Sequence, residues 1–304
     1  MTTHHSPVVR HQHLDAQAAL LLVLLCALWG FNQVTIKLAI AGISPVMQAG
    51  LRSVIAVAVL LVWMRMRGIS LLDSDRAWLP GLAAGLMFAL EFAMLYYGLQ
   101  FTSASRAIVF LYMAPFVVTL GMHWLVPAER LNWIQNTGML LAFAGVVVIF
   151  SENITGAGGQ TWIGDLLAFG AAVFWGLTTL TVRLTRLAHI PASRTLFYQL
   201  AVSALILPPV SMAMGEPGVF NLTPLVLACL LFQGVVVAFA SYMAWFWLIG
   251  RYPVSILSGY TFVAPVFGVI AGVMVLGEPV TGELIAGAVL VAAGIYMVNK
   301  RRRA

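Results

Sequence analysis

Charged residues are scarce in this sequence. Only 9% of its 304 residues are Asp, Glu, Lys or Arg, whereas 62% are hydrophobic. The mean hydropathy is +0.97. A soluble protein of this length carries about 25% charged residues, which cover the surface that faces water. The composition therefore excludes a soluble globular protein and indicates an integral membrane protein.

Sequence patterns for disulfide, metal and nucleotide chemistry are also lacking. The two cysteines, Cys26 and Cys229, lie inside apolar runs, so we expect no disulfide framework. No His-Glu-x-x-His or Cys-x-x-Cys pattern occurs, and no Gly-rich loop ends in Gly-Lys-Ser or Gly-Lys-Thr. We therefore expect no metal site, no cofactor and no use of ATP. Because no cluster of His, Asp, Ser or Cys lies at membrane depth, we expect a protein that is not an enzyme.

Apolar runs of membrane-crossing length fill most of the chain. A spanning helix needs about 20 residues, and the connections between the runs are short, so neighbouring helices should be antiparallel. We predict an all-α membrane protein with ten transmembrane helices, at 17–38, 46–64, 77–100, 105–126, 131–150, 162–185, 192–213, 223–249, 254–276 and 282–299.

The basic residues predict the orientation of these helices. Most of them fall on one side of the membrane if both termini are cytoplasmic: Arg65, Arg67, Arg76, Arg130, Arg186, Arg194, Arg251 and Lys300 to Arg303. The opposite loops hold Glu152, Glu216 and Glu278 but no Lys or Arg, and Lys37 and Arg106 are the exceptions. The net charge of +6 therefore indicates cytoplasmic loops of a multi-pass protein of the bacterial inner membrane, rather than a nucleic-acid surface.

Several features occur twice, in the same order. Trp29-Gly30 recurs as Trp175-Gly176, 146 positions later, and Ala114-Pro115 recurs as Ala264-Pro265, 150 positions later. Such self-similarity indicates an internal duplication. Five spans in each half is an odd number, so the two repeats should be inverted, an arrangement typical of secondary transporters. We expect a disordered tail at 1–15, a first repeat at 16–150, an outer linker at 151–160, a second repeat at 161–300 and a basic tail at 301–304.

These repeated motifs carry a family resemblance. The two Trp-Gly pairs, the mid-span Ala-Pro pairs, Gly277-Glu278-Pro279 after the ninth span and the basic tail resemble the EamA family of the drug/metabolite transporter superfamily. Within it the chain is most similar to YddG-type amino-acid exporters. The resemblance covers about residues 16 to 300. It implies export of amino acids or similar metabolites through a central cavity between the halves.

Two ionisable residues are predicted inside spans. Glu91 should lie about 14 Å below the outer surface, and Arg52 at a depth that differs by only about 5 Å, at 1.5 Å per residue. Charged groups at such depths usually face a cavity or pair with one another. One interpretation is that Glu91 carries a proton or meets a substrate ammonium group. The other is that Arg52 and Glu91 form a structural ion pair, or that Arg52 reaches outward while Glu91 stays protonated.

The Trp-Gly stretches are candidates for the cavity wall. Trp29 with Asn32, and Trp175 with Thr178, are three residues apart and share a helix face. Tryptophan at mid-membrane, away from the interface, suggests an apolar wall with an N–H donor. The alternative is simple packing between helices, with Gly30 and Gly176 allowing close approach; these glycines are also candidate hinges.

Prolines and further polar residues complete the candidate set. Pro115 and Pro265 should interrupt their helices and provide either a hinge or a fixed kink. Tyr112 and Tyr260 lie about one turn before these prolines, and Gln233 is costly to bury without a partner. We count all three among the cavity residues.

The sequence-based expectation is thus a secondary transporter that works by alternating access. Its expected partners are the lipid bilayer and a small-molecule substrate, with amino acids as the expected class. No nucleic acid is expected. Both a monomer and a homodimer remain open. The alternatives are an exporter of drug-like cations or other metabolites, and a channel or scaffold that carries nothing.

Overall fold

The computed structural model describes residues 15–71, 77–126, 132–154, 159–252, 261 and 263–299. Within these ranges the regular structure is helical, apart from one isolated bridge between Ile43 and Val219. The expected tails, except for Asp15, and the candidate residue Tyr260 lie outside the described residues.

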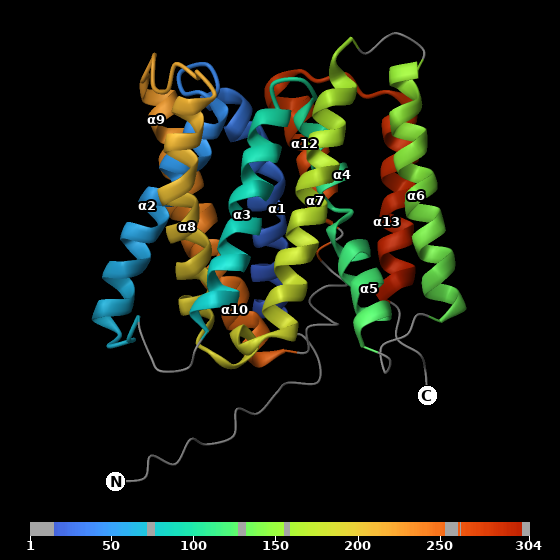
Figure 1. Ribbon diagram of the computed structural model, residues 1–304. Helices are drawn as coiled ribbons and strands as arrows, with labels where there is room; N and C mark the ends of the chain where they lie inside the picture. Colours follow the sequence, from blue (N-terminus) through green and yellow to red (C-terminus); the bar gives the residue numbers. More distant parts are fainter. Residues whose placement is uncertain are drawn as a thin grey trace.

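The helices follow one another as an up-and-down bundle (Figure 1). The first half contains α1 (Ala16–Ala39), α2 (Pro45–Met66), α3 (Trp78–Gly98), α4 (Ala104–Leu111), α5 (Ala114–Leu125) and α6 (Trp133–Ile154). The second half contains α7 (Thr161–Leu184), the short 3-10 helix η2 (Arg186–His189), α8 (Ala192–Ala213), α9 (Pro224–Leu231), the π-helix η3 (Phe232–Ser241), α10 (Tyr242–Arg251), α12 (Ala264–Leu276) and α13 (Gly282–Asn299).

Local sequence signals set the ends of these helices. The side chains of Asp15 and Ser103 accept hydrogen bonds from backbone N–H groups in the first turns of α1 and α4. Pro45 begins α2, where a missing N–H costs nothing. Gly277 ends α12 with a φ of 65°, a conformation that glycine adopts without strain.

Seven helical stretches among the described residues are long and apolar enough to cross a membrane: 16–39, 45–66, 78–98, 104–125, 161–184, 192–213 and 224–248. Three further apolar helices are shorter, at 133–149, 264–276 and 282–297. The all-helical membrane class is therefore confirmed, whereas the count of ten spans stays a prediction.

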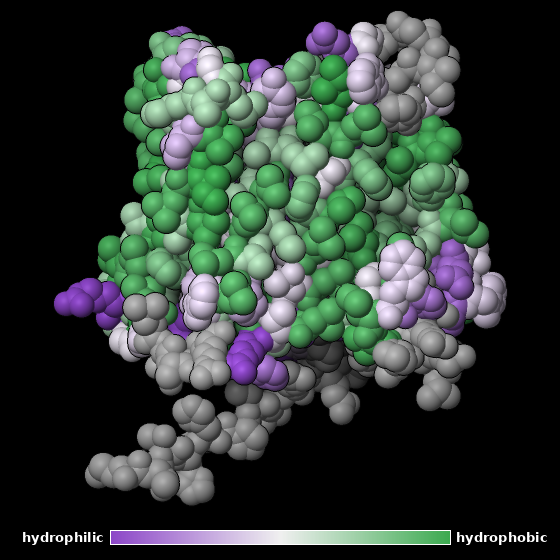
Figure 2. Space-filling view, in the orientation of Figure 1, coloured by the Kyte–Doolittle hydropathy of each residue, from purple (hydrophilic) through white to green (hydrophobic). Residues whose placement is uncertain are grey.

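The molecular surface agrees with a membrane environment. Hydrophobic residues cover most of the face between the two ends of the bundle, and hydrophilic residues gather near those ends (Figure 2). Large apolar side chains are well exposed on α6 and α13, among them Leu140 and Val289. A surface of this kind is stable against lipid and not against water.

Helices of one half pack mainly against helices of the other. α2 packs on α8, and α6 packs on α13. The other large contacts come in matched sets. α1 lies against α12 as α7 lies against α4 and α5, and α3 lies against α7 as η3 and α9 lie against α1. Exchanging each span with its counterpart in the other half keeps these large contacts, whereas the contact of α2 with α3 has no counterpart of comparable size. The pattern agrees with the expected relation between the halves, and the inverted repeat itself stays a prediction.

Glycines allow the closest of these contacts. A Cβ at Gly30 would lie 2.8 Å from the carbonyl oxygen of Ala264, and a Cβ at Gly176 would lie 2.6 Å from Cβ of Val117. Both glycines lie inside continuous helices, directly against the segment that begins with an Ala-Pro pair. The structure thus gives them the close-packing role, and their expected role as hinges is untested.

Three of the predicted spans are irregular in their described residues. Pro115 stands at the start of α5, after a break at Tyr112 and Met113 that separates α5 from α4, so the proline follows the break rather than kinking a continuous helix. Pro265 similarly stands at the start of α12. Residues 232–241 form a π-helix, a rare geometry that is frequent at functional sites.

The loops define two different ends of the bundle. We call the end with loops 40–44, 99–103, 214–223 and 277–281 the acidic end, since it holds Glu216 and Glu278. The other end, which we call the basic end, holds Arg67, Arg186 and Arg251. α1 begins and α13 ends at the basic end (Figure 1).

The glycine contacts between α6 and α13 lead to a stability prediction. A Cβ at Gly287 would clash with the side chain of Ile149 and lie 2.6 Å from the carbonyl oxygen of Gly145. We expect Gly287→Val to lower the free energy of unfolding by about 1–3 kcal/mol, because the two helices must separate. Thermal and denaturant unfolding of the purified protein in micelles measures this.

Gly282→Val on the same helix is the matched control, because no atom lies within 4 Å of its Cβ position. It should change the stability by less than about 0.5 kcal/mol. Equal effects of the two substitutions would contradict this account of the α6–α13 contact.

Candidate functional site

A group of buried polar side chains lies between α2, α3 and η3. We call Gln48, Arg52, Glu91, Tyr96 and Gln233 the Arg52 cluster. Gln48 Nε2 donates to Gln233 Oε1 at 3.0 Å, and the Tyr96 hydroxyl donates to the same oxygen at 3.1 Å. Arg52 Nη1 lies 3.5 Å from the Tyr96 hydroxyl, a long contact. The cluster joins two helices of the first half to the π-helix of the second.

Three helical segments, α2, α3 and η3, supply the side chains of the Arg52 cluster. Gln48 and Arg52 are four residues apart on α2, so they lie one above the other on one helix face. Glu91 and Tyr96 lie on α3. Gln233 lies at the beginning of η3, where the helix changes from α to π geometry.

Aromatic rings surround the guanidinium of Arg52. Its Cζ lies 3.6 Å from the ring centroid of Phe92, and 6.0 Å and 5.6 Å from those of Phe88 and Tyr96. Such contacts favour a desolvated cation by about 2 kcal/mol at best. That is less than a buried charge without a counter-ion costs.

Several polar atoms of this region have no hydrogen-bond partner. Nε and Nη2 of Arg52, Oε2 of Glu91 and Nε2 of Gln233 are all buried without one. The same holds for Oδ1 of Asn32 and Oε1 of Gln33 on the neighbouring α1. Buried polar groups are nearly always paired, so a concentration of exceptions marks a site where a polar ligand can bind.

The expected Arg52–Glu91 ion pair is not formed in this structure. Both side chains are buried, with 0% and 4% of their surface exposed. The ion pairs Lys37–Glu278 and Arg106–Asp165 do not involve them. Arg52 stacks on Phe92 instead, and each of the two charged groups keeps unpartnered atoms.

Some of the predicted cavity residues contact one another or the cluster. Trp29 Nε1 donates to Ser241 Oγ at 2.9 Å, at the end of η3, and its ring packs edge-on against Trp245. The rings of Tyr112 and Trp175 meet edge-on, with centroids 5.7 Å apart. Each tryptophan thus contacts residues of the other half: Trp29 contacts Ser241 and Trp245, and Trp175 contacts Tyr112.

The remaining candidates are placed as follows. Thr178 is buried, and its hydroxyl oxygen has no partner. Asn32 is buried beside Tyr96. Two surface grooves lie elsewhere. The first has a volume of about 650 Å³ and is lined by Leu79, Pro80, Ala83, Thr181, Arg183, Leu184, Thr185, Arg186 and His189. The second has a volume of about 560 Å³ and is lined by Leu21, Trp63, Ala192, Ser193, Met243, Ala244, Phe246 and Trp247. Neither groove includes a predicted cavity residue.

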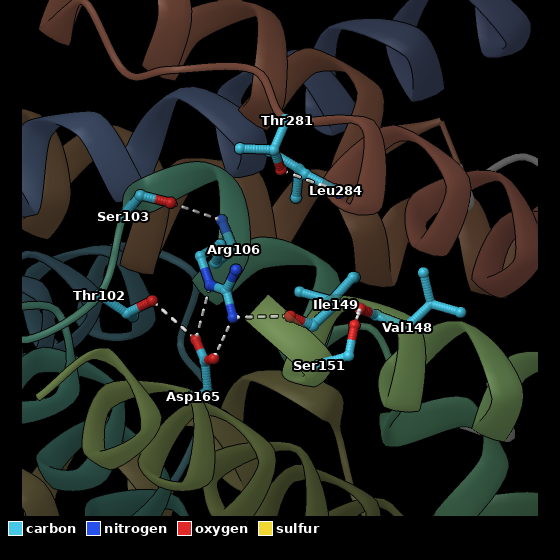
Figure 3. Close-up of polar contacts among 9 residues, drawn as sticks. All are labelled: Thr102, Ser103, Arg106, Val148, Ile149, Ser151, Asp165, Thr281 and Leu284. Carbon is cyan, nitrogen blue, oxygen red and sulfur yellow. Dashed lines mark hydrogen bonds and ion pairs between the residues drawn. The ribbon is translucent and has the colours of Figure 1, made fainter. Parts of the chain in front are cut away.

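A second buried charge site lies at the acidic end, and the sequence analysis did not assign it. Arg106 donates to Asp165 through Nε, at 3.2 Å, and through Nη2, at 2.5 Å (Figure 3). Nη2 also donates to the carbonyl oxygen of Ile149 at 3.0 Å, and the Thr102 hydroxyl donates to Asp165 at 2.7 Å. This ion pair ties α4, α6 and α7 together. Two features of the sequence could have indicated this pair: Asp165 lies inside an apolar run, and Arg106 lies on the side of the membrane that otherwise lacks basic residues.

Loop carboxylates cap helices of the other half at the same end. Glu278 accepts hydrogen bonds from the backbone N–H groups of Ala104 and Ser105, at 2.7 and 2.9 Å, at the start of α4. Glu216 accepts from Val46 and Met47, at 3.3 and 3.2 Å, at the start of α2. A carboxylate at a helix N-terminus is favoured by the helix dipole. Both contacts join the two halves at the acidic end.

A bundle of membrane-crossing helices with a buried polar cluster between its halves is typical of a membrane transporter. Comparison with known sequences defines the class further. Residues 16–151 and residues 162–300 each match the EamA-like transporter family, so the chain belongs to that family. The resemblance to the EamA family that the repeated motifs carry is thereby confirmed.

Similar proteins are transporters by name. The chain is 30% identical to "Uncharacterized transporter YvbV" of Bacillus subtilis, over 95% of this chain and 93% of that protein. It is 26% identical to "Probable amino-acid metabolite efflux pump" of Escherichia coli, over 93% and 94% of the two chains. A protein of the same name from Salmonella typhimurium is also 26% identical, over 91% and 93%.

A crystal structure of a protein has the same fold. It matches with a TM-score of 0.65 and 23% identity, over 94% of this chain and 98% of the other. At this identity the match bears on the fold alone.

The Arg106–Asp165 pair gives a second stability prediction. Asp165→Asn leaves a buried guanidinium without its counter-ion, and we expect it to lower the free energy of unfolding by about 3–5 kcal/mol. Denaturant unfolding in micelles measures the loss. Glu283→Gln, which removes an exposed carboxylate near the same end, is the control and should have little effect.

The double variant Asp165→Asn with Arg106→Gln tests the pairing itself. It should be more stable than the sum of the two single losses, because no unpaired charge remains. Strict additivity would contradict a direct ion pair.

Proposed function

We propose that this protein exports amino acids or similar small metabolites across the bacterial inner membrane. The observation that carries the proposal is the Arg52 cluster, where buried and unpartnered donors and acceptors gather between the two halves. A substrate with both donors and acceptors would complete their hydrogen bonds. The export direction and the substrate class are supported by the names of two relatives, the probable amino-acid metabolite efflux pumps.

We further propose that transport proceeds by alternating access between inverted repeats. Three observations support this. The family matches the chain twice, once in each half. The largest contacts between the helices are matched when the halves are exchanged. The contacts of Glu216 and Glu278 join the two halves through loops at the acidic end, and such loop contacts can open without disturbing the helix core.

In this proposal the residues have separate roles. The Arg52 cluster, with Asn32, forms the polar part of the substrate site. Trp29, Tyr112 and Trp175 supply aromatic surface to the transport path, and Thr178 supplies a hydroxyl group. The break before Pro115 and the start of α12 at Pro265 are the points where the spans bend, while Gly30 and Gly176 keep α1 and α7 in contact with the bending segments.

Transport into proteoliposomes tests the function. We expect saturable counterflow of at least one labelled amino acid from a full panel, because a carrier must cycle between two states. Liposomes without protein are the control for leakage. Flux that rises linearly with concentration would indicate a channel, and flux of drug-like cations without amino acids would favour the other substrate class.

Glu91→Gln tests a coupling role for the buried carboxylate. If Glu91 carries the proton, the variant should lose accumulation that a pH gradient drives, while exchange of substrate across the membrane continues. Glu283→Gln, at an exposed carboxylate, should keep the pH dependence. Unchanged pH dependence in Glu91→Gln would contradict proton transfer through Glu91.

A further inference from the structure

Arg52 and Arg106 are both buried, but only Arg106 of the two has a carboxylate bound to its guanidinium. Arg106 uses Nε and Nη2, the two donors on one edge of its guanidinium, to bind both oxygens of Asp165. Arg52 is more deeply buried, and its Nε and Nη2 have no partner. Nη1, on the other edge, lies 3.5 Å from the hydroxyl of Tyr96, and the hydroxyl of Tyr242 also lies close to the Arg52 side chain.

The unpartnered edge of Arg52 has the geometry of a carboxylate receptor. Nε–H and Nη2–H are parallel and fixed in one plane, so they bind the two oxygens of a carboxylate together. The Arg106–Asp165 contact shows this mode within the same protein. The ring of Phe92 covers one face of the guanidinium, and Nε and Nη2 on its edge have no hydrogen-bond partner.

Charge balance at the site indicates which carboxylates fit. Arg52 and Glu91 are buried near each other, and Tyr242 lies beside both. A simple cation would pair with Glu91 and leave the guanidinium unbalanced. A phosphate would bring excess negative charge toward Glu91. A zwitterion satisfies both groups, with its carboxylate on Arg52 and its ammonium group near Oε2 of Glu91.

We propose that Arg52 binds the carboxylate of the transported substrate side-on through Nε and Nη2. This inference rests on the proposed function and narrows it: the substrate is an α-amino acid or another small zwitterion with a free carboxylate. The amide groups of Gln48 and Gln233 position the Tyr96 hydroxyl, which keeps Nη1 occupied and turns the other edge toward the substrate.

Direct binding to the purified full-length protein tests the carboxylate contact. The probes are L-leucine and L-phenylalanine, their amides, and the amines that lack the carboxylate, titrated calorimetrically in micelles. We expect each acid to bind roughly 30-fold more tightly than its amide, because an unpaired buried charge remains in the amide complex. Equal binding of acid and amide, or no binding of either acid, would overturn the proposal.

Substitutions identify the residue responsible. Arg52→Gln should remove the preference for the acid over the amide, and Arg52→Lys, which keeps the charge but loses the fork, should retain part of it. Arg65→Gln, at an exposed arginine of the same helix, is the matched control and should leave the preference intact. An intact preference in Arg52→Gln would refute the assignment.

A further variant does not depend on how well Arg52→Gln folds. Gln233→Glu keeps Arg52 and supplies a carboxylate inside the cluster. We expect its melting temperature to rise and its affinity for both acids to fall by at least about tenfold, because the internal carboxylate competes for the guanidinium. Unchanged affinity in a folded Gln233→Glu protein would contradict the proposal.

Flux measurements with the same variants separate this inference from the proposed function. If the wild type transports amines as well as acids, and Arg52→Gln does not alter the ratio, the carboxylate contact is wrong and the transporter assignment stands. If no probe is transported but the acid preference is present and lost in Arg52→Gln, the carboxylate site stands and the export function is wrong.

Discussion

The structure depends above all on how two guanidinium groups are accommodated inside an apolar bundle. A charge in this environment is costly unless other groups neutralise it. Arg106 is neutralised by Asp165, with Thr102 and a backbone carbonyl completing its surroundings, and it fixes three helices at the acidic end. Arg52 is met by aromatic rings and one long contact to a phenol. The first arrangement is complete without a ligand and serves stability, whereas the second leaves Nε and Nη2 of Arg52 without a partner, as the proposed carboxylate contact requires.

The contacts between the halves are of two physical kinds, and they divide the rigid parts from the mobile ones. Gly30, Gly176 and the glycines of α6 and α13 bring backbones into direct contact, and such packing changes only as a unit. The caps by Glu216 and Glu278 are small groups of hydrogen bonds between a loop carboxylate and a helix N-terminus, and water can replace them. A motion that opens the acidic end would therefore break the caps and keep the glycine contacts, turning helix pairs as rigid bodies.

The sequence predicted the helical spans well, because bilayer thickness and apolar length are both local properties. The span at 192–213 coincides with α8, and the run at 17–38 differs from α1 by one residue at each end. The pairing of charges was less predictable. Lys37 and Arg106 were recognised as exceptions to the charge rule, but their partners, Glu278 and Asp165, come from distant spans, which only the tertiary fold brings near. The π-helix at 232–241 has no sequence signature at all.

The two halves differ at the positions that match Arg52 and Glu91. At the repeat offset of 146 the counterpart of Arg52 is Tyr198, and at the offset of 150 the counterpart of Glu91 is Ser241. At these positions the first half carries charged groups, on α2 and α3, while η3 of the second half offers Gln233 and Ser241 as neutral partners. In a mechanism of alternating access the charged ends of a zwitterion would stay bound to the first half, because that contact is the stronger one. The second half would then make and break neutral hydrogen bonds as it moves, so each cycle would avoid separating a buried ion pair.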